Sequence, residues 1–185
     1  MTGSTKQAFG AALKQMMKQK PVDKITVKDL VVICGVNRQT FYYHFDDIYD
    51  LLEWVFEEDA SQVLPKSILK DNWKENTQVF FDYLSVNASF ALNVYNSNSR
   101  TYMLRFLKEH VQSCIRSYAE VISDGRNIDR QDFDFVIEFY SNAVVGLLSQ
   151  WLDRGLKFPP NVTEERIFIA LENSVESVLG RFTKK

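Results

Sequence analysis

The sequence is poor in the residues that end helices and build turns. Its 185 residues include only 7 glycines and 4 prolines. No long stretch alternates apolar and polar residues between turn signals, as half-buried strands do. There is also no internal repeat and no low-complexity segment. The sequence therefore predicts an all-α protein.

Long apolar runs and cysteine are scarce as well. No run of about 18 apolar residues is present, which argues against a membrane-spanning helix. Residues 1–10 lack the apolar core of a secretory signal. The two cysteines, Cys34 and Cys114, lie in apolar helical contexts. Free buried thiols in a reducing compartment are favoured over a disulfide there, so we expect a cytoplasmic protein without contact to a membrane.

The residue patterns of common active sites are missing too. The chain has two histidines, no metal-ligand spacing, no nucleophile elbow and no glycine-rich phosphate loop. Adjacent acids, such as Glu57 with Glu58 and Glu164 with Glu165, point in different directions from a helix and are not catalytic pairs. We expect no enzyme, no cofactor and no metal.

Charge is distributed unevenly along the chain. Residues 1–45 contain seven lysines and arginines against two acids, a net charge of +5, and the remainder carries −7 of the total of −2. A basic segment on an acidic body is typical of a protein in which only that segment meets a polyanion. A chance excess of lysine on a solvated helix would give the same count.

The most informative segment is residues 26–45, TVKDLVVICGVNRQTFYYHF. Thr26 can cap a helix that Gly35 ends, and Asn37 can cap a second, short helix that reaches about Tyr43. The first helix has an apolar stripe at helical spacing: Val27, Leu30, Val31 and Cys34. Two short helices joined by such a tight turn predict a helix-turn-helix.

In a helix-turn-helix, the first turn of the second helix points into the major groove of DNA. Arg38 and Gln39 fall in that turn, and they can pair with guanine and adenine in bidentate fashion. Thr40 is small enough to allow close approach, while Phe41 and Phe45 are expected to anchor the helix in the core. Plain solvent exposure would explain each polar residue alone, but their order after the glycine turn favours base reading.

This segment, with the helix before it and the LLEWVF sequence after it, resembles the DNA-binding module of the TetR/AcrR family of bacterial transcriptional regulators. The resemblance covers about the first 60 residues. It implies an N-terminal three-helix DNA-binding domain, residues 1–50, and a larger helical domain, residues 51–185, that binds an effector and dimerises. The expected function is an effector-responsive repressor bound to a pseudo-palindromic operator in double-stranded DNA.

The resemblance also implies roles for single residues. Base contacts are expected from the start of the second helix, and phosphate contacts from both helices. The candidate DNA-binding residues are Thr26, Lys28, Asn37, Arg38, Gln39, Thr40, Tyr42 and His44. Tyr43 is expected to pack.

Two departures from the family pattern favour an alternative. The family usually places a lysine that meets phosphate at the position of Ile48. Val32 and Ile33 lie off the buried stripe of their helix, where the family tends to have charged residues. The alternative is a regulator or interaction protein that depends on a partner protein because its own DNA binding is weakened.

The remaining chain predicts helices at about Trp73–Val86, Ala88–Tyr95, Thr101–Ile122, 129–152 and 164–181. Pairing of the last two with their copies would form a four-helix dimer interface, although the same stripes could form an intramolecular core. The sequence WLDRGLKFPP resembles the C-terminal region of a subgroup of this family. That subgroup includes the coactivator of dihydroxyacetone kinase genes, which works with a second protein.

Aromatic residues on these helices predict an effector pocket for a small apolar or aromatic molecule. The candidates are Phe80, Tyr83, Tyr102, Phe106, His110 and Phe139. An aromatic stripe at helical spacing is more often core than pocket, and a lone histidine is more often structural than ligand-binding.

Overall fold

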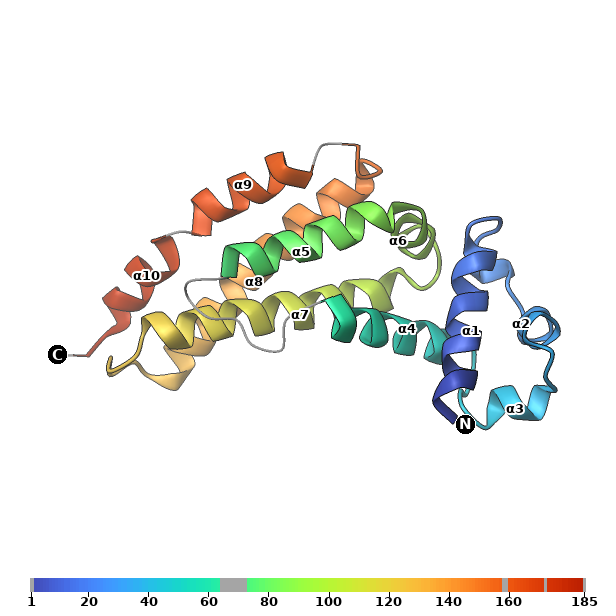
Figure 1. Ribbon diagram of the computed structural model, residues 1–185. Coiled ribbons are helices and arrows are strands. Elements are labelled where there is room, and N and C mark those ends of the chain that lie inside the picture. Colours follow the sequence, from blue (N-terminus) through green and yellow to red (C-terminus); the bar gives the residue numbers. More distant parts are fainter. Residues whose placement is uncertain (1, 64–72, 158–159, 172, 185) are drawn as a thin grey trace. The chain divides into compact units, whose positions relative to one another are not determined.

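The computed structural model describes residues 2–63, 73–157, 160–171 and 173–184. All regular structure in these residues is helical, apart from one isolated bridge between Ile128 and Thr183, and the predicted all-α class is confirmed (Figure 1). Within them, no helix has both the length and the hydropathy of a membrane span. The helices are α1 (Thr2–Met17), η1 (Val22–Lys24), α2 (Val27–Cys34), α3 (Arg38–Tyr42), α4 (Ile48–Val63), α5 (Trp73–Val86), α6 (Ala88–Tyr95), α7 (Arg100–Ile122), α8 (Arg130–Asp153), α9 (Pro160–Leu171) and α10 (Ser174–Phe182).

The chain divides into two compact units. Unit 1 comprises residues 1–62 and 87–103, and unit 2 comprises residues 63–86 and 104–185. The predicted boundary after residue 50 falls inside α4, and α6 packs with the N-terminal helices although it is distant in sequence. The division into units depends on contacts between segments that are distant in sequence, and such contacts cannot be read from the local sequence pattern.

The core of unit 1 is organised around Phe9 of α1, which is fully buried. Its ring meets the rings of Phe41 and Phe45 edge to face, at centroid distances of 5.2 and 6.3 Å. Phe45 also contacts Trp54 of α4, with 5.7 Å between the ring centroids. Edge-to-face pairs of this kind are favourable beyond the area they bury. The short helix α3 is thereby held against α1 and α4 by the aromatic residues expected to anchor it.

Asn93 of α6 joins distant backbone segments within unit 1. Its amide nitrogen donates to the carbonyl oxygens of Met17 and Lys20, at 2.7 and 2.9 Å. Its side-chain oxygen accepts from the amide of Val22 at 2.9 Å. These backbone groups lie where α1 ends and η1 begins, so they lack partners within a helix. One α6 side chain therefore satisfies three of them.

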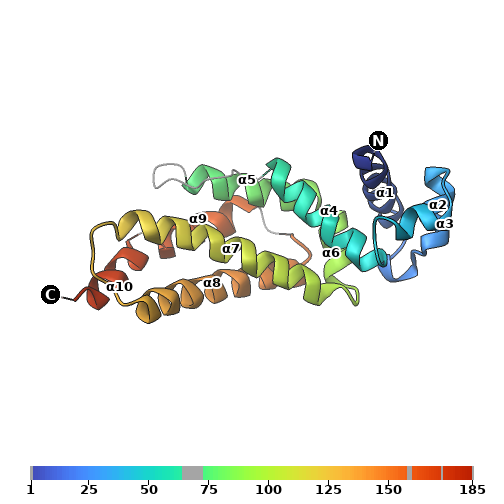
Figure 2. The same ribbon diagram turned by 90° about the horizontal axis from the view of Figure 1, so that it is seen from below.

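Unit 2 is built on α7 and α8, which lie next to each other in Figure 2, whereas α8 passes behind α7 at an angle in Figure 1. Arg116 of α7 pairs with Asp134 of α8 at 2.7 Å, and Lys108 lies 3.7 Å from Glu138. Helix α5 packs on α9, and α10 packs on α8. The interior between these helices is apolar, with Ile137, Leu148, Trp151, Ile167 and Leu179 buried.

The C-terminal segment differs from the sequence-based expectation. One helix over 164–181 was predicted, but the structure has two, α9 and α10. Asn173 precedes α10 with φ of 64° and ψ of −20°, in the left-handed region. A right-handed helix cannot continue through that conformation, and asparagine is among the few residue types other than glycine that adopt it readily. The prediction of one helix is therefore wrong.

Candidate functional site

In the helix-turn-helix, the residue just before each helix caps the free amides at the helix start with its side chain. These caps fix where α2 and α3 begin. Thr26 accepts from the amide of Asp29, and Asp29 accepts from the amide of Thr26, which makes a reciprocal capping box. Gly35 ends α2 in the left-handed conformation, with φ of 65°. The amide of Val36 then donates to the carbonyl of Val31 at 3.0 Å, which closes the turn.

Asn37 sets the start of α3. Its side-chain oxygen accepts from both the amide and the hydroxyl of Thr40, at 2.8 and 3.0 Å. Between these two residues, Arg38 and Gln39 are exposed, while Phe41 is fully buried. The predicted base-reading residues therefore lie on the outer side of a helix whose other side is anchored in the core.

The residues after Phe41 form the end of α3. Tyr42 is exposed and its ring packs edge to face on Phe41, and His44 is half-buried. Tyr43 was expected to pack, but 78% of its surface is exposed. It stands at the C-cap of the five-residue helix α3, where consecutive residues turn to different faces, and its ring contacts only the neighbouring His44 among the described aromatic pairs.

Some of the basic residues in the N-terminal segment have acidic partners. Lys20 donates to Asp29 at 2.9 Å, and this bond is the first cause that lowers the pKa of Asp29 to about 2. Lys14 forms an ion pair with Asp59. Lys28 on α2 is exposed beside the helix start at Thr26, which suits contact with phosphate.

The start of α4 has capping acids where the family pattern has a cation. Asp47 accepts from the amides of Tyr49 and Asp50, at 2.7 and 2.9 Å, and Asp50 accepts from the amide of Asp46 at 2.9 Å. Ile48 is half-buried between them. These carboxylates stabilise the helix start, but they offer no positive charge to a phosphate.

Two apolar residues of α2 are exposed, as their place off the buried stripe indicated. Val32 has 71% of its surface exposed and Ile33 has 50%. They lie on the helix that precedes the reading helix. Exposed apolar neighbours of this kind are more typical of contact surfaces than of a solvated helix.

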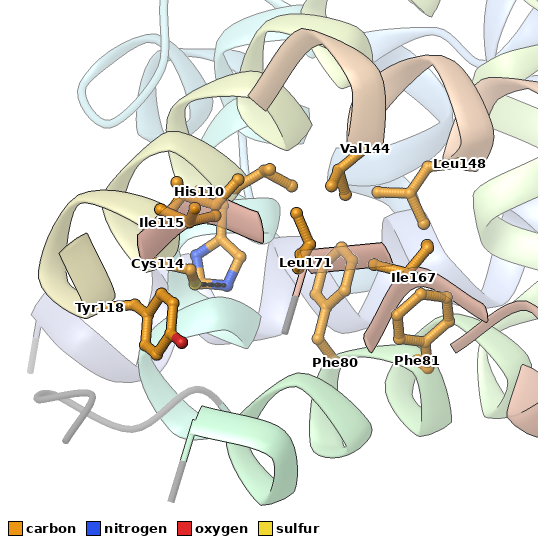
Figure 3. Close-up of a pocket in the computed structure, with 12 residues that line it drawn as sticks. Phe80, Phe81, His110, Cys114, Ile115, Tyr118, Val144, Leu148, Ile167 and Leu171 are labelled. Atoms are coloured by element: carbon orange, nitrogen blue, oxygen red, sulfur yellow. Dashed lines mark hydrogen bonds between the residues drawn. The ribbon is translucent and has the colours of Figure 1, made fainter. Parts of the chain in front are cut away.

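Unit 2 contains an apolar cavity of about 50 Å³ (Figure 3). Five helices, α5 and α7 to α10, contribute to its wall. The lining residues are Phe80, Phe81, His110, Val111, Cys114, Ile115, Tyr118, Val144, Leu148, Ile167, Leu171 and Val175.

His110 is the most polar group of this lining. Its Nε2 lies 3.5 Å from the Sγ of Cys114, and its ring packs against Phe80 and Phe106, with centroid distances of 5.3 and 6.4 Å. Burial lowers the pKa of His110 to about 4 and raises the pKa of the Cys114 thiol to about 12. Both groups are therefore uncharged at neutral pH. Among the described residues, no three histidine, cysteine or carboxylate side chains are grouped as metal ligands.

The candidate effector residues do not all meet at this cavity. Phe80 and His110 line it, and Phe106 is not part of the lining but its ring contacts that of His110. Tyr83 is half-buried on α5 and is not part of the lining. Tyr102 belongs to unit 1, where it stacks on Tyr49 at a centroid distance of 6.0 Å.

Phe139 is also absent from the lining, because it faces outward from α8 with 58% of its surface exposed. Cys114 and Tyr118 also line the cavity, although the sequence-based prediction of the pocket did not include them. They follow His110 at intervals of four residues, and that helical spacing was the available signal.

One face of α8 is exposed and apolar. Phe135, Phe139 and Leu147 recur at intervals of four or eight residues, and the exposed Ala143 and Gly146 lie between them. Small residues among large apolar ones allow another helix to approach closely. Such a face is typical of a helix–helix interface.

Comparison with known protein families gives two matches. Residues 11–55 match the family described as bacterial regulatory proteins, tetR family. Residues 71–173, more than half of the chain, match the TetR-type family described as transcriptional regulator C-terminal region. The first match contains α2 and α3, and the second contains most of the residues that line the cavity.

A curated relative is the HTH-type dhaKLM operon transcriptional activator DhaS of Lactococcus lactis subsp. lactis (strain IL1403). It is 26% identical over 91 residues, which are 49% of this chain and 49% of that protein. The chain thus matches about half the length of this relative. The similarity agrees with the subgroup that the WLDRGLKFPP sequence suggested.

Solved structures show the same fold. The dihydroxyacetone kinase operon activator DhaS has a TM-score of 0.71 at 18% identity, over 97% of this chain and 98% of that one. A tetR-family transcriptional regulator from Streptomyces coelicolor has a TM-score of 0.60 at 12% identity, over 97% of this chain and 88% of that one. With both family matches and this architecture, the chain belongs to the TetR family of bacterial transcriptional regulators.

Proposed function

We propose that this regulator binds a pseudo-palindromic operator as a homodimer, and that a small apolar effector in the cavity of unit 2 changes its affinity for that operator. The observation that carries the proposal is the first turn of α3. There, Arg38 and Gln39 are exposed on a helix that the buried Phe41 anchors.

DNA recognition follows from the chemistry of α2 and α3. Arg38 and Gln39 would read base edges in the major groove. Thr26 and Lys28 at the start of α2 would bind phosphate, joined by Tyr42 and His44 at the end of α3. Asn37 and Thr40 would act mainly by holding the start of α3 in place, since they hydrogen-bond each other.

The homodimer would form through the exposed apolar face of α8, with α9 and α10 beside it. The family typically forms homodimers, and two copies of α2–α3 would then read two half-sites of a symmetric operator. The apolar face of α8 supports this assignment, because large exposed apolar patches mark protein contacts.

Helix α7 would carry the effector signal. Residues 100–103 of α7 belong to unit 1, whereas His110 and Cys114 on the same helix line the cavity in unit 2. An effector that favours one arrangement of α7 would therefore shift the conformation of unit 1. Coupling of this kind is reciprocal, so operator DNA would alter effector affinity by the same factor.

The test is binding of the purified chain to the promoter region beside its own gene, measured over a series of salt concentrations. We expect specific binding that weakens steeply with salt. Arg38→Ala should lower operator affinity by about 1–3 kcal/mol. The control Arg38→Lys keeps the charge but not the bidentate geometry, so it should lose base specificity while the salt slope stays unchanged. Full operator affinity in both variants would contradict base reading by Arg38.

A second candidate is a regulator that requires a partner protein for DNA binding. The exposed Val32 and Ile33 and the missing cation at Ile48 favour it. It predicts weak binding to all DNA at low salt and tight binding once the partner is added. Val32→Ser with Ile33→Ser would then abolish the gain from the partner without changing the weak intrinsic binding.

The sign of regulation is a separate point. Repression is the usual mode in this family, whereas the similar DhaS is named as an activator. A reporter gene under the native promoter, compared with and without the regulator, measures this sign. We expect repression, and loss of expression on deletion of the regulator would establish activation instead.

A further inference from the structure

The polar groups of the unit 2 cavity are gathered on one helix. His110, Cys114 and Tyr118 follow one another at intervals of four residues on α7, whereas the other lining residues are apolar. Figure 3 shows these three side chains toward one end, with Phe81, Ile167 and Leu148 toward the other. A molecule in this cavity would meet hydrogen-bonding groups at one end only.

The described lining of the cavity offers no charge to a ligand. Among the lining residues that the structure describes, none is an aspartate, glutamate, lysine or arginine. Burial keeps His110 unprotonated at neutral pH, since it lowers the pKa to about 4, and it keeps the Cys114 thiol protonated. An ionised ligand would be buried here without a counter-charge, which is strongly unfavourable.

The small size of the cavity argues against any ligand larger than one ring. A volume of 50 Å³ corresponds to about three to five water molecules, since one water needs about 10–15 Å³ by this measure. An apolar cavity of about 150 Å³, about three times this volume, binds benzene in another protein. A single ring would therefore enter only if the helices move apart slightly, and a larger ligand would require a larger movement.

The walls favour an aromatic ring. The rings of Phe80 and Phe81 lie 6.2 Å apart and both face the cavity. Phe80 also packs on the imidazole of His110 at 5.3 Å. Flat apolar rings gain from stacked and edge-to-face contact with such surfaces.

We propose that the unit 2 cavity binds a small uncharged molecule of one aromatic ring that places a single hydroxyl group beside His110. This inference rests on the proposed function, in which the cavity is the effector site. It excludes carboxylates, phosphates and ammonium compounds as effectors that bind there.

The experiment uses four probes of nearly equal size with the full chain at pH 7: benzyl alcohol, toluene, benzoate and benzylammonium. Methyl resonances in ¹H–¹³C NMR spectra report where and how tightly each probe binds. We expect benzyl alcohol and toluene to shift the methyl signals of Val144, Leu148, Ile167 and Leu171. Benzoate and benzylammonium should bind at least about tenfold more weakly, because each buries an unpaired charge.

His110→Phe tests the hydroxyl contact while it keeps a ring at this position. Toluene should bind the variant within about twofold of its wild-type affinity. Benzyl alcohol should bind it at least about fivefold more weakly, because its buried hydroxyl loses its partner. His44→Phe is the matched control, since it replaces the second histidine, which lies in unit 1 and outside the cavity lining. Equal loss of toluene binding in His110→Phe would show a packing defect and overturn the hydroxyl assignment.

Three results would overturn the proposal as a whole: no binding of benzyl alcohol and toluene at millimolar concentration, benzoate binding as tight as benzyl alcohol, or shifts confined to methyl groups outside the cavity. Operator binding is measured on the same preparation. Operator binding without probe binding would refute only this inference, whereas probe binding without operator binding would refute the proposed function.

Discussion

Among single residues, those at the start of α3 are of two kinds: two hold the helix start in place, and the two between them are exposed. Asn37 and Thr40 hydrogen-bond each other and hold the helix start. Arg38 and Gln39, between them, are exposed and carry the long side chains that can span to base edges. Under the proposed function, the four consecutive polar residues therefore have two different roles, helix support and base reading, although they look alike in the sequence.

Ile48 permits a direct test of the proposed DNA interface, because the family pattern has a phosphate-binding lysine at this position. Ile48→Lys should tighten binding to all DNA and steepen the dependence of log K on log salt by about 0.9, because one more phosphate is neutralised. The measurement is a salt series with operator and with unrelated DNA. Val86→Lys adds the same charge to an exposed position of α5, outside the proposed DNA-binding helices, and should leave the slope unchanged. Equal slopes for the wild type and Ile48→Lys would show that this position does not face the DNA backbone.

His110 should make the protein less stable in mild acid. The unfolded state takes up a proton near pH 6.5, but folded His110 does so only near pH 4, because burial disfavours the charged form. Its contribution is therefore fully present above pH 6.5 and is lost as the pH falls toward 4, by up to about 3 kcal/mol at about 1.36 kcal/mol per pKa unit.

Urea unfolding of the wild type and His110→Phe between pH 4 and 7 measures this effect. The difference in their free energies of unfolding should change with pH over that window. A difference that stays constant from pH 7 to pH 4 would contradict a neutral buried His110.

Among the helices, α6 stands out because its role depends on contacts that are distant in sequence. Asn93 is separated from its three backbone partners by 71 to 76 residues. It supports the end of α1 and the segment that leads into the reading helices. Helix α6 is thus part of the DNA-binding unit in packing, although it follows α5 of unit 2 in the chain.

Asn93→Leu keeps the size of the side chain but removes all three hydrogen bonds. We expect a loss of about 1–3 kcal/mol in stability, since buried backbone groups are left without partners. Operator affinity should also fall as α1 and η1 lose their fixed position. Denaturant unfolding and operator titration measure the two effects. Asn96→Leu, at an exposed position just after α6, is the control. Wild-type stability and operator affinity of Asn93→Leu would show that Asn93 does not support the end of α1 and η1.

For the whole molecule, the exposed face of α8 predicts the oligomeric state. Phe139→Glu should convert the proposed homodimer to a monomer, because a carboxylate would be buried in the proposed apolar interface. Val86→Glu changes an exposed residue of α5 in the same unit and should leave the dimer intact. Sedimentation velocity gives the mass of each variant. The Phe139→Glu monomer should also lose most of its operator affinity, since it reads one half-site only. A dimeric Phe139→Glu protein would place the interface elsewhere.

The all-α class, the helix-turn-helix and its caps could be predicted from the sequence because each depends on residues a few positions apart. Thr26 with Asp29, Gly35 and Asn37 act through local backbone geometry. The apolar residues that define the periodicity of α2 likewise lie within two turns of helix.

The cavity, the role of Asn93 and the break at Asn173 became evident only in the tertiary structure. Five helices meet to form the cavity, so no single stripe identifies its lining. Phe80 and Phe139 look equivalent as aromatic residues on helices, but one is buried and the other exposed. Which face of a helix turns inward depends on the partners that pack against it, and those partners lie tens of residues away in the chain.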